Sequence, residues 1–218
     1  MDIVLDDAEV RILGCLIEKE MTTPEYYPLS LNALTNACNQ KSNRNPVVSF
    51  DETGVAHKLD SLQGKSLVRK TQAAGSRVTK YLHTILDLFD LSRQEMAVLC
   101  ELMLRGPQTA GEIRSRTERM SVLGDLEEAE KTLRTLIDQD PPLALKLPRQ
   151  AGRKECRYTH LLSGVPSGEN ETYDLPPAPA AQQVPTHERI TRLEEEIAEL
   201  RTELGELKQA FAEFKSQF

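Results

Sequence analysis

The chain has 218 residues, of which 39% are hydrophobic, and a net charge of −7. This length predicts one or two domains, and the absence of an apolar run of about 18 residues excludes a membrane-spanning helix. The first residues, Met1 to Asp7, lack the basic start and the long apolar stretch of a secretory signal. We therefore expect a cytoplasmic protein with no membrane partner.

Catalytic and metal-binding signatures are missing from the sequence. The four cysteines (Cys15, Cys38, Cys100 and Cys156) are widely separated and form no C-x-x-C pair, which is typical of reduced and mostly buried thiols. There is no Gly-rich phosphate loop, no H-E-x-x-H and no nucleophile elbow. We expect no enzyme activity, no metal and no cofactor.

The negative charge lies mainly at the C-terminal end. Residues 1–84 carry 10 Lys/Arg and 10 Asp/Glu, residues 85–162 carry 12 and 13, and residues 163–218 carry 5 and 11. Residues 39–83, however, include 8 Lys/Arg and only 3 Asp/Glu. This local basic surplus is compatible with contacts to phosphate, although it is far from the basicity of strong nucleic-acid binders.

The first 162 residues repeat one plan of elements. A capping box, Asp6 with Glu9 and Ser92 with Glu95, predicts the start of a first helix in each copy. A second helix is expected after Ser30 and after Thr109. The apolar residues of a third helix have the same spacing in both copies: Val55, Leu59 and Leu62 in one, Ala129, Leu133 and Leu136 in the other.

Each copy ends in a strand, a turn with glycine and another strand. Residues 75–83 (GSRVTKYLH) align with residues 152–160 (GRKECRYTH), including the Tyr and His near the end. Three helices followed by a two-stranded ribbon form a winged helix. The sequence therefore predicts a mainly α fold with small β wings: winged-helix domains at 1–84 and 85–162, a Pro/Gly-rich linker at 163–186 and a coiled-coil helix at 187–218.

The first copy is longer than the second at two places. It has about seven more residues around Met21–Pro28 and five more between its second and third helices, where the stretch NQKSNRN occupies 39–45. Insertions in a repeated unit are places where function tends to reside. Lys41 and Arg44 of this stretch could hold phosphates, with Asn43 donating to sugar or backbone oxygens. Alternatively, the stretch folds back and its amides satisfy helix ends and turns.

The run NACNQKSNRNPVVSFDE (36–52), the paired winged-helix plan and the heptad tail together resemble the YceH-like family of uncharacterised bacterial proteins. The resemblance covers essentially the whole chain. It implies a cytosolic protein with paired winged helices and no assigned reaction or ligand, and it carries over no catalytic residues.

The tail from Ile190 has apolar residues at unbroken spacings of three and four. Ile at the a positions and Leu at d favour a parallel two-stranded coiled coil, and the flanking charges pair attractively in that arrangement. We expect a parallel homodimer; the alternative is that the stripe packs back onto a winged helix of its own chain. The predicted dimerisation residues are Ile190, Leu193, Ile197, Leu200, Leu204, Leu207, Phe211 and Phe214.

Two functions fit these observations, and the first is the one we expect, because the local basic surplus and the stretch NQKSNRN favour contact with DNA. The first is a winged-helix regulator that binds duplex DNA as a dimer, with candidate phosphate contacts at Lys41, Asn43, Arg44, Lys58, Arg77 and Lys80. The second is a protein-interaction scaffold without direct DNA binding, similar in fold to accessory proteins of chromosome condensation. The acidic start of the second copy's third helix (Asp125, Glu127, Glu128 and Glu130) disfavours insertion into a DNA groove and favours the scaffold.

Overall fold

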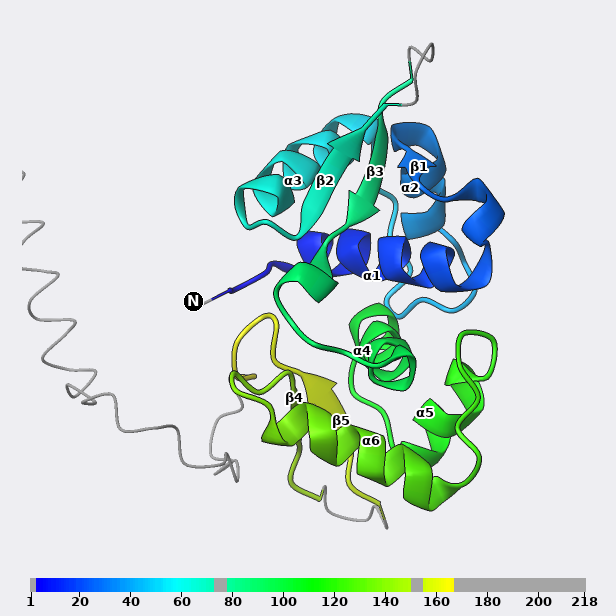
Figure 1. The fold of residues 1–218 in the computed structure, drawn as a ribbon, viewed down its shortest axis with the longest axis vertical. Helices are drawn as coiled ribbons and strands as arrows, with labels where there is room; N and C mark the ends of the chain where they lie inside the picture. The colour runs from blue at the N-terminus through cyan, green and yellow to red at the C-terminus, as the bar shows by residue number, and fades with distance from the viewer. Residues whose placement is uncertain (1–2, 73–77, 150–154, 167–218) are drawn as a thin grey trace, which may run out of the picture. The chain divides into compact units, whose positions relative to one another are not determined.

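The computed structural model describes residues 3–72, 78–149 and 155–166. Within these ranges the chain forms six α-helices and two small antiparallel sheets (Figure 1). No helix in these ranges is long and apolar enough to cross a membrane. The predicted linker and coiled-coil helix lie almost entirely outside the described residues, which end at Pro166.

The N-terminal half contains three helices and a three-stranded sheet. The strand order is β1-β3-β2, and β3 pairs with both neighbours. Its elements are α1 (Asp7–Thr22), the 3-10 turn η1 (Pro24–Tyr26), β1 (Leu29–Ser30), α2 (Leu31–Cys38), α3 (Glu52–Gly64), β2 (Val68–Thr71) and β3 (Lys80–His83).

The C-terminal half has its elements in a similar order. After the 3-10 turn η2 (Ile85–Asp87) come α4 (Arg93–Arg105), α5 (Ala110–Thr117), α6 (Leu126–Asp138), β4 (Ala144–Lys146) and β5 (Tyr158–His160). Strands β4 and β5 pair antiparallel, and a single bridge joins Gln108 to Tyr158. This bridge stands where Leu29 of β1 pairs with Tyr81 in the first half.

The predicted helix starts are confirmed. Asp6 and Ser92 each cap their helix through a full capping box with the Glu three residues later. Ser30 and Thr109 accept hydrogen bonds from the backbone of the first turn of α2 and α5. Such caps satisfy amide groups that have no partner within the helix, which fixes the first residue of each element.

The two ribbons also share a contact between a lysine and an aromatic ring. Lys70 lies opposite Tyr81 on β2 and β3, with its Nζ 6.0 Å from the ring centroid. Lys146 lies opposite Tyr158 on β4 and β5, with its Nζ 5.9 Å from that centroid. Both tyrosines are buried, so they are core residues whose outer faces carry a cation.

One connected cluster of buried side chains runs through both halves. The helices α1 and α4 pack closely at its centre, because a Cβ on Gly14 would lie 3.0 Å from a terminal methyl of Leu104. The Cys100 thiol donates to the Gly14 carbonyl across this crossing at 3.3 Å.

The predicted domain boundary at 84/85 falls between β3 and η2, but the core is continuous across it. Matching positions of the two halves are buried in this cluster: Leu13, Leu34, Leu59 and Tyr81 in the first, and Leu99, Ile113, Leu133 and Tyr158 in the second.

Candidate nucleic-acid interface

The NQKSNRN stretch lies between the two halves of the molecule. It follows the last turn of α2, and the Asn39 side chain closes it into a loop through two 2.8 Å hydrogen bonds with the backbone of Phe50. Asn43 adopts a left-handed conformation with φ of 59°, which asparagine tolerates better than most residues. The loop is therefore fixed by its own side chains.

Arg44 points into the core and not toward solvent. Its side chain has no exposed surface, and it donates to the Ala37 carbonyl at the end of α2. It also donates to Glu18 of α1, with Nη1 2.9 Å from Oε1. In this structure Arg44, a candidate phosphate contact, is instead held inside the protein by a carboxylate and a helix carbonyl.

Glu18 is the buried centre of a charged network. Burial disfavours its charged form, but the hydrogen bond and the charge of Arg44, together with Arg119, lower the pKa of Glu18 below its usual value. Arg119 follows α5 and bridges two buried carboxylates, with its Nη2 2.6 Å from Glu18 Oε1 and 2.9 Å from Glu101 Oε1. Arg105 forms a further ion pair with Glu101 at 2.9 Å. The network thus joins α1, the loop, α4 and the segment after α5.

The rest of the loop binds the C-terminal end of α4. The backbone amide of Asn45 donates to the Leu104 carbonyl at 2.9 Å, and the side-chain oxygen of Asn43 accepts a hydrogen bond from Arg105. Carbonyls in the last turn of a helix lack partners within the helix, so the loop satisfies one of them. The side-chain oxygen of Asn43, another candidate contact, is therefore occupied by Arg105 of α4. Folding back is the alternative that the geometry supports, with α4 of the other half as an additional acceptor.

The network shows which residues the sequence reasoning missed. Glu18, Glu101 and Arg119 were not singled out, although Glu18 and Glu101 each stand within a run of buried helical residues. A carboxylate in such a position is almost never fully buried without a partner. That signal could have identified both acids, but the sequence gives no distance that would match them to Arg44 or Arg119.

The other candidate contacts lie at the surface of the N-terminal half. Lys58 on α3 is ion-paired with Asp6 at 2.6 Å, and both side chains are more than 40% exposed. Lys41 is exposed and Lys80 is half-buried; within the described ranges neither has a carboxylate within ion-pair distance. Arg77 lies outside the described residues, and so do the predicted dimerisation residues of the tail.

The remaining cations near α3 also have acidic partners. Lys65 contacts Glu9 at 2.6 Å, Lys70 contacts Asp60 at 2.8 Å and Arg69 lies 3.6 Å from Asp87. The local surplus of cations expected from the sequence is thus distributed over ion pairs with carboxylates from α1, α3 and η2. A phosphate approaching α3 or β2 would meet these carboxylates together with the cations.

The start of α6 is acidic, as the sequence predicts. Asp125 caps the helix, and Glu127 is exposed beside it. Glu128 turns back to the Gly124 amide at 2.6 Å and to the Gln94 amide at 2.7 Å. The acidic residues therefore stabilise the helix start and leave a negative surface there.

The histidines at the ends of β3 and β5 belong to the fold. His83 is buried and its Nε2 contacts Glu20, which lies near the end of α1. Burial lowers the pKa of His160 to about 4, so this imidazole is neutral at pH 7. Among the described residues, no group of three or more His, Cys, Asp or Glu is arranged to hold a metal ion.

Comparison with known proteins places the chain in a family. A family model described as a protein of unknown function, DUF480, matches residues 5–153. The chain is 55% identical over 219 residues to a UPF0502 protein of Geobacter metallireducens and 56% identical over 218 residues to one of Geotalea daltonii. Each match covers 100% of this chain and 100% of the relative. A UPF0502 protein of Koribacter versatilis is 52% identical over 182 residues, which cover 84% of this chain and 81% of that relative. The chain therefore belongs to the DUF480 (UPF0502) family of bacterial proteins of unknown function.

Proposed function

We propose that the chain is a non-catalytic protein-interaction scaffold built from two tandem winged-helix domains, 1–84 and 85–162. The order of three helices and an antiparallel ribbon in each half supports this architecture (Figure 1). The matched contacts Lys70–Tyr81 and Lys146–Tyr158 support it further, since they occupy the same register in both ribbons.

One observation favours a protein partner over DNA. Four cations on or beside α3 and β2, namely Lys58, Lys65, Arg69 and Lys70, are each paired with a carboxylate. Phosphate neutralisation supplies most of the affinity of non-specific DNA binding. Because the cations of this helix and ribbon are already paired with acids, they can neutralise few phosphates. A surface of mixed charge suits a protein partner instead.

The charged network gives the scaffold a fixed geometry. Glu18, Arg44, Glu101 and Arg119 join α1 to α4 through buried ion pairs, and the loop from Asn39 ties both helices together. The exposed surfaces of the two domains are consequently held in one arrangement. Such an arrangement suits the presentation of two surfaces to one partner.

The test measures DNA binding and protein binding with the same full-length chain. We expect duplex DNA to bind no tighter than non-specific complexes do, about 10⁻⁴ to 10⁻⁶ M at physiological salt. We expect cross-linking in the native cell to recover a defined protein partner in stoichiometric amount after nuclease treatment. Specific binding of duplex DNA, together with loss of every cross-linked protein on nuclease treatment, would refute the scaffold.

A nucleic-acid-binding regulator is the second candidate, and the exposed cation Lys41 with Lys80 of β3 favours it. If these residues bind phosphates, replacing both by alanine weakens binding similarly for all DNA sequences. The slope of the logarithm of affinity against the logarithm of salt concentration would then fall by about one for each phosphate that is no longer neutralised. Absence of any duplex binding by the wild type at low salt removes this candidate.

We also propose that the tail makes the protein a parallel homodimer, on the heptad pattern from Ile190 to Phe214. Sedimentation equilibrium of the full-length chain tests this. We expect a dimer at tens of micromolar, and a large loss of self-association when Leu200 and Leu207 are both changed to aspartate. A full-length chain that stays monomeric at that concentration contradicts the dimer.

A further inference from the structure

A groove of about 140 Å³ lies between the start of α5, the first turns of α6 and the ribbon of β4 and β5. Gly111 lines it on the side of α5, Leu126 and Glu130 on the side of α6, and Tyr158 on the side of the ribbon. No atom lies within 4 Å of the Cβ that a side chain on Gly111 would add, so the groove is open there. Small-molecule sites typically exceed about 300 Å³, and this groove therefore suits one side chain of a partner better than a whole ligand.

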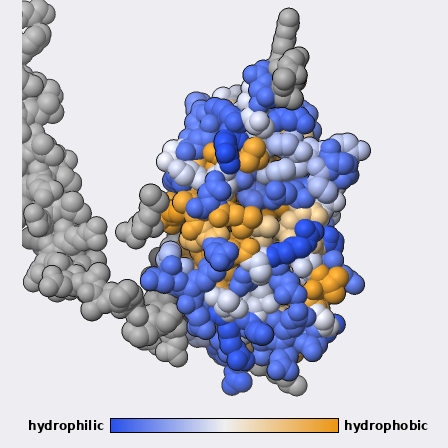
Figure 2. Space-filling view, in the orientation of Figure 1, coloured by the Kyte–Doolittle hydropathy of each residue, from blue (hydrophilic) through white to orange (hydrophobic). Residues whose placement is uncertain are grey.

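Apolar side chains are exposed at the groove and just before it in the chain. Leu126, the first residue of α6, is 45% exposed, and Val122 of the preceding connector is 67% exposed. Figure 2 shows an apolar area near this connector, amid mostly hydrophilic surface. Covering such side chains removes apolar area from water, which stabilises a complex.

The charges at this end of α6 are acids that are not matched by cations. Residues 122–130 contain four Asp/Glu and no Lys/Arg. Asp125 and Glu127 flank Leu126 and are exposed, and neither forms an ion pair with another residue of the described ranges. Glu130 lies 3.8 Å from Arg134, with both side chains more than 40% exposed. Exposed pairs of this kind contribute little, so Glu130 remains available to another cation.

The ribbon side of the groove adds one cation and one acid. Lys146 Nζ stands 5.9 Å from the centroid of the Tyr158 ring, and Glu155 is exposed. The start of α6 thus keeps its negative charge, unlike the paired surface of α3 and β2. This charge repels phosphate and attracts a basic partner. A free cation would gain nothing from the exposed Val122 and Leu126, whereas a segment that is both basic and apolar would cover them.

We propose that this groove binds a basic, amphipathic segment of a partner protein. An apolar side chain of the segment enters the groove beside Leu126, and its flanking Lys or Arg side chains lie against Asp125, Glu127 and Glu130. The proposal rests on the proposed scaffold function and names the chemistry of the partner and the surface that binds it.

A short fluorescent peptide with lysine and leucine at helical spacing is the probe for this chemistry. It should bind the full-length wild type at physiological salt, and Leu126→Ser combined with Glu127→Lys should weaken binding at least about tenfold. A peptide with glutamate in place of every lysine should not bind. The proposal is overturned if the wild type fails to bind the lysine peptide or binds both peptides equally.

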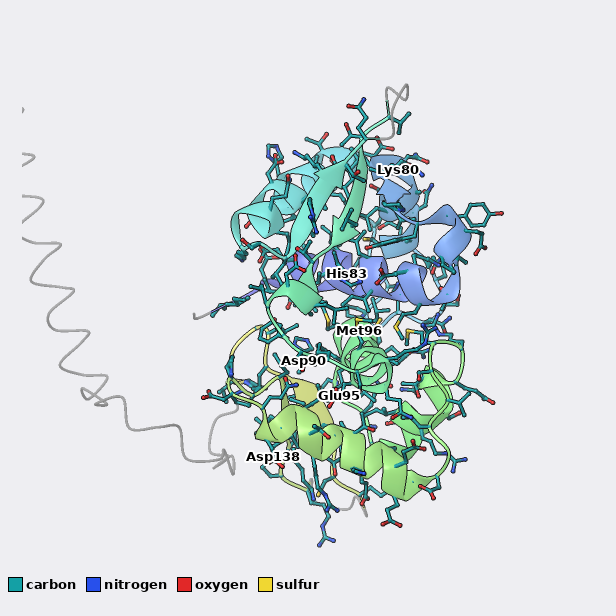
Figure 3. The ribbon with its side chains drawn as sticks, in the orientation of Figure 1. Lys80, His83, Asp90, Glu95, Met96 and Asp138 are labelled. Atoms are coloured by element: carbon teal, nitrogen blue, oxygen red, sulfur yellow. The ribbon has the colours of Figure 1, made fainter. Side chains whose placement is uncertain are left out.

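The matched control makes the same two kinds of change away from the groove. Asp138→Lys alters an exposed acid at the other end of α6, where Figure 3 shows it, and Val47→Ser alters an apolar residue with 54% exposure in the N-terminal half. Binding by this double variant should stay within about twofold of wild type, because a charge so far along the helix is screened at physiological salt. Equal weakening by the two double variants would show that the peptide follows net charge alone and would overturn the proposal.

Cross-linking in the native cell tests the same surface without charge reversal, so it stays valid if the variants perturb folding. A photoreactive residue in place of Leu126 should give, after nuclease treatment, a protein adduct whose cross-linked segment is rich in Lys and Arg. The same residue in place of Asp138 should give none. Equal yields at the two positions overturn the proposal, and so does an adduct to nucleic acid or to a segment without a basic excess.

A third position separates this proposal from the scaffold function itself. Tyr26 is 70% exposed on η1 of the N-terminal half. A protein adduct from a photoreactive residue at that position, with none from position 126, overturns the groove as the binding surface and leaves the scaffold intact. Absence of a protein adduct from all three positions refutes both.

Discussion

The connectors between the second and third helices differ between the two halves, yet each contributes an arginine that binds the same buried acid, Glu18. Thirteen residues separate α2 from α3, and eight separate α5 from α6. The longer connector places Arg44 fully inside the core, whereas Arg119 of the shorter one keeps 30% of its side chain exposed. The five extra residues thus give a deeper burial of charge and a set of contacts with α4.

This comparison shows why an inserted polar stretch need not be a binding surface. Lys, Arg and Asn donors that suit phosphate also suit helix carbonyls and buried carboxylates. The N-terminal half offers two such acceptors, the Ala37 carbonyl and Glu18, within reach of the connector. The other half offers the end of α4. The insertion joins the two halves, and its composition reflects this role.

The largest expected effect comes from the more deeply buried arginine. Arg44→Ala leaves Glu18 buried with only part of its charge compensated, and loss of one partner of a buried ion pair costs about 3–5 kcal/mol. Arg119→Ala should cost less, about 1–3 kcal/mol, because water can reach its site. Urea unfolding of both variants measures the difference, with Lys41→Ala as a surface control within about 0.5 kcal/mol of wild type. Equal losses for the two arginines would show that burial depth does not distinguish the connectors.

Most of the fold could be predicted from the sequence, because the signals there are local. Capping boxes and apolar spacing depend on neighbours within one turn, and the starts of α1 and α4 and the burial of Leu59 and Leu133 agree with the structure. The candidate site could not be predicted to the same degree. Arg44 meets Glu18 across 26 residues, and Arg105 meets Asn43 across 62. Such distant pairings depend on how α1 packs against α4, about which one sequence carries no local signal.

The second prediction compares the cores of the two halves. Leu59 and Leu133 occupy matching positions on α3 and α6, and neither has exposed surface. Leu→Ala at either position removes buried methyl groups and leaves a cavity, at a cost of about 2–5 kcal/mol. Because one connected cluster includes both residues, we expect one cooperative unfolding transition in each variant. Two separate transitions in Leu133→Ala, one at the wild-type midpoint, would show that the halves unfold independently.

The third prediction concerns the aligned histidines at the ends of β3 and β5. His83 contacts Glu20, whereas burial lowers the pKa of His160 to about 4, from about 6.5 in the unfolded chain. Between these values the unfolded state binds a proton that the folded state does not, so stability is full above pH 6.5 and is lost as the pH falls toward 4. The negative charge of Asp7 opposes part of this loss.

The measurement is urea unfolding of wild type and His160→Leu at pH 7 and pH 5. We expect the wild type to lose on the order of 1–2 kcal/mol more than the variant between these pH values. Other groups, the carboxylates of the charged network included, titrate in both proteins and cancel in the difference. An identical pH dependence in both proteins would show that solvent reaches the imidazole in the folded state.

The last prediction concerns the crossing of α1 and α4, where the two halves differ by one small residue. The capping boxes align Gly14 of α1 with Cys100 of α4, and these two residues touch through the thiol and the Gly14 carbonyl. Gly14→Ala gains about 1 kcal/mol of helix propensity. The added Cβ would lie 3.0 Å from a methyl of Leu104 and 3.3 Å from the Met103 Cβ, and overpacking of this kind costs about 1–3 kcal/mol.

Leu104 is fully buried and the Met103 Cβ moves only with its backbone, so the crowding should outweigh the propensity. We expect a net loss of about 1 kcal/mol in the free energy of unfolding. Gly111→Ala on α5 is the matched control, because no atom lies within 4 Å of the Cβ that it would add. That variant should be as stable as wild type or more stable. If Gly14→Ala is stabilised as much as Gly111→Ala, then α1 and α4 can move apart at no cost, and their close approach at Gly14 does not contribute to stability.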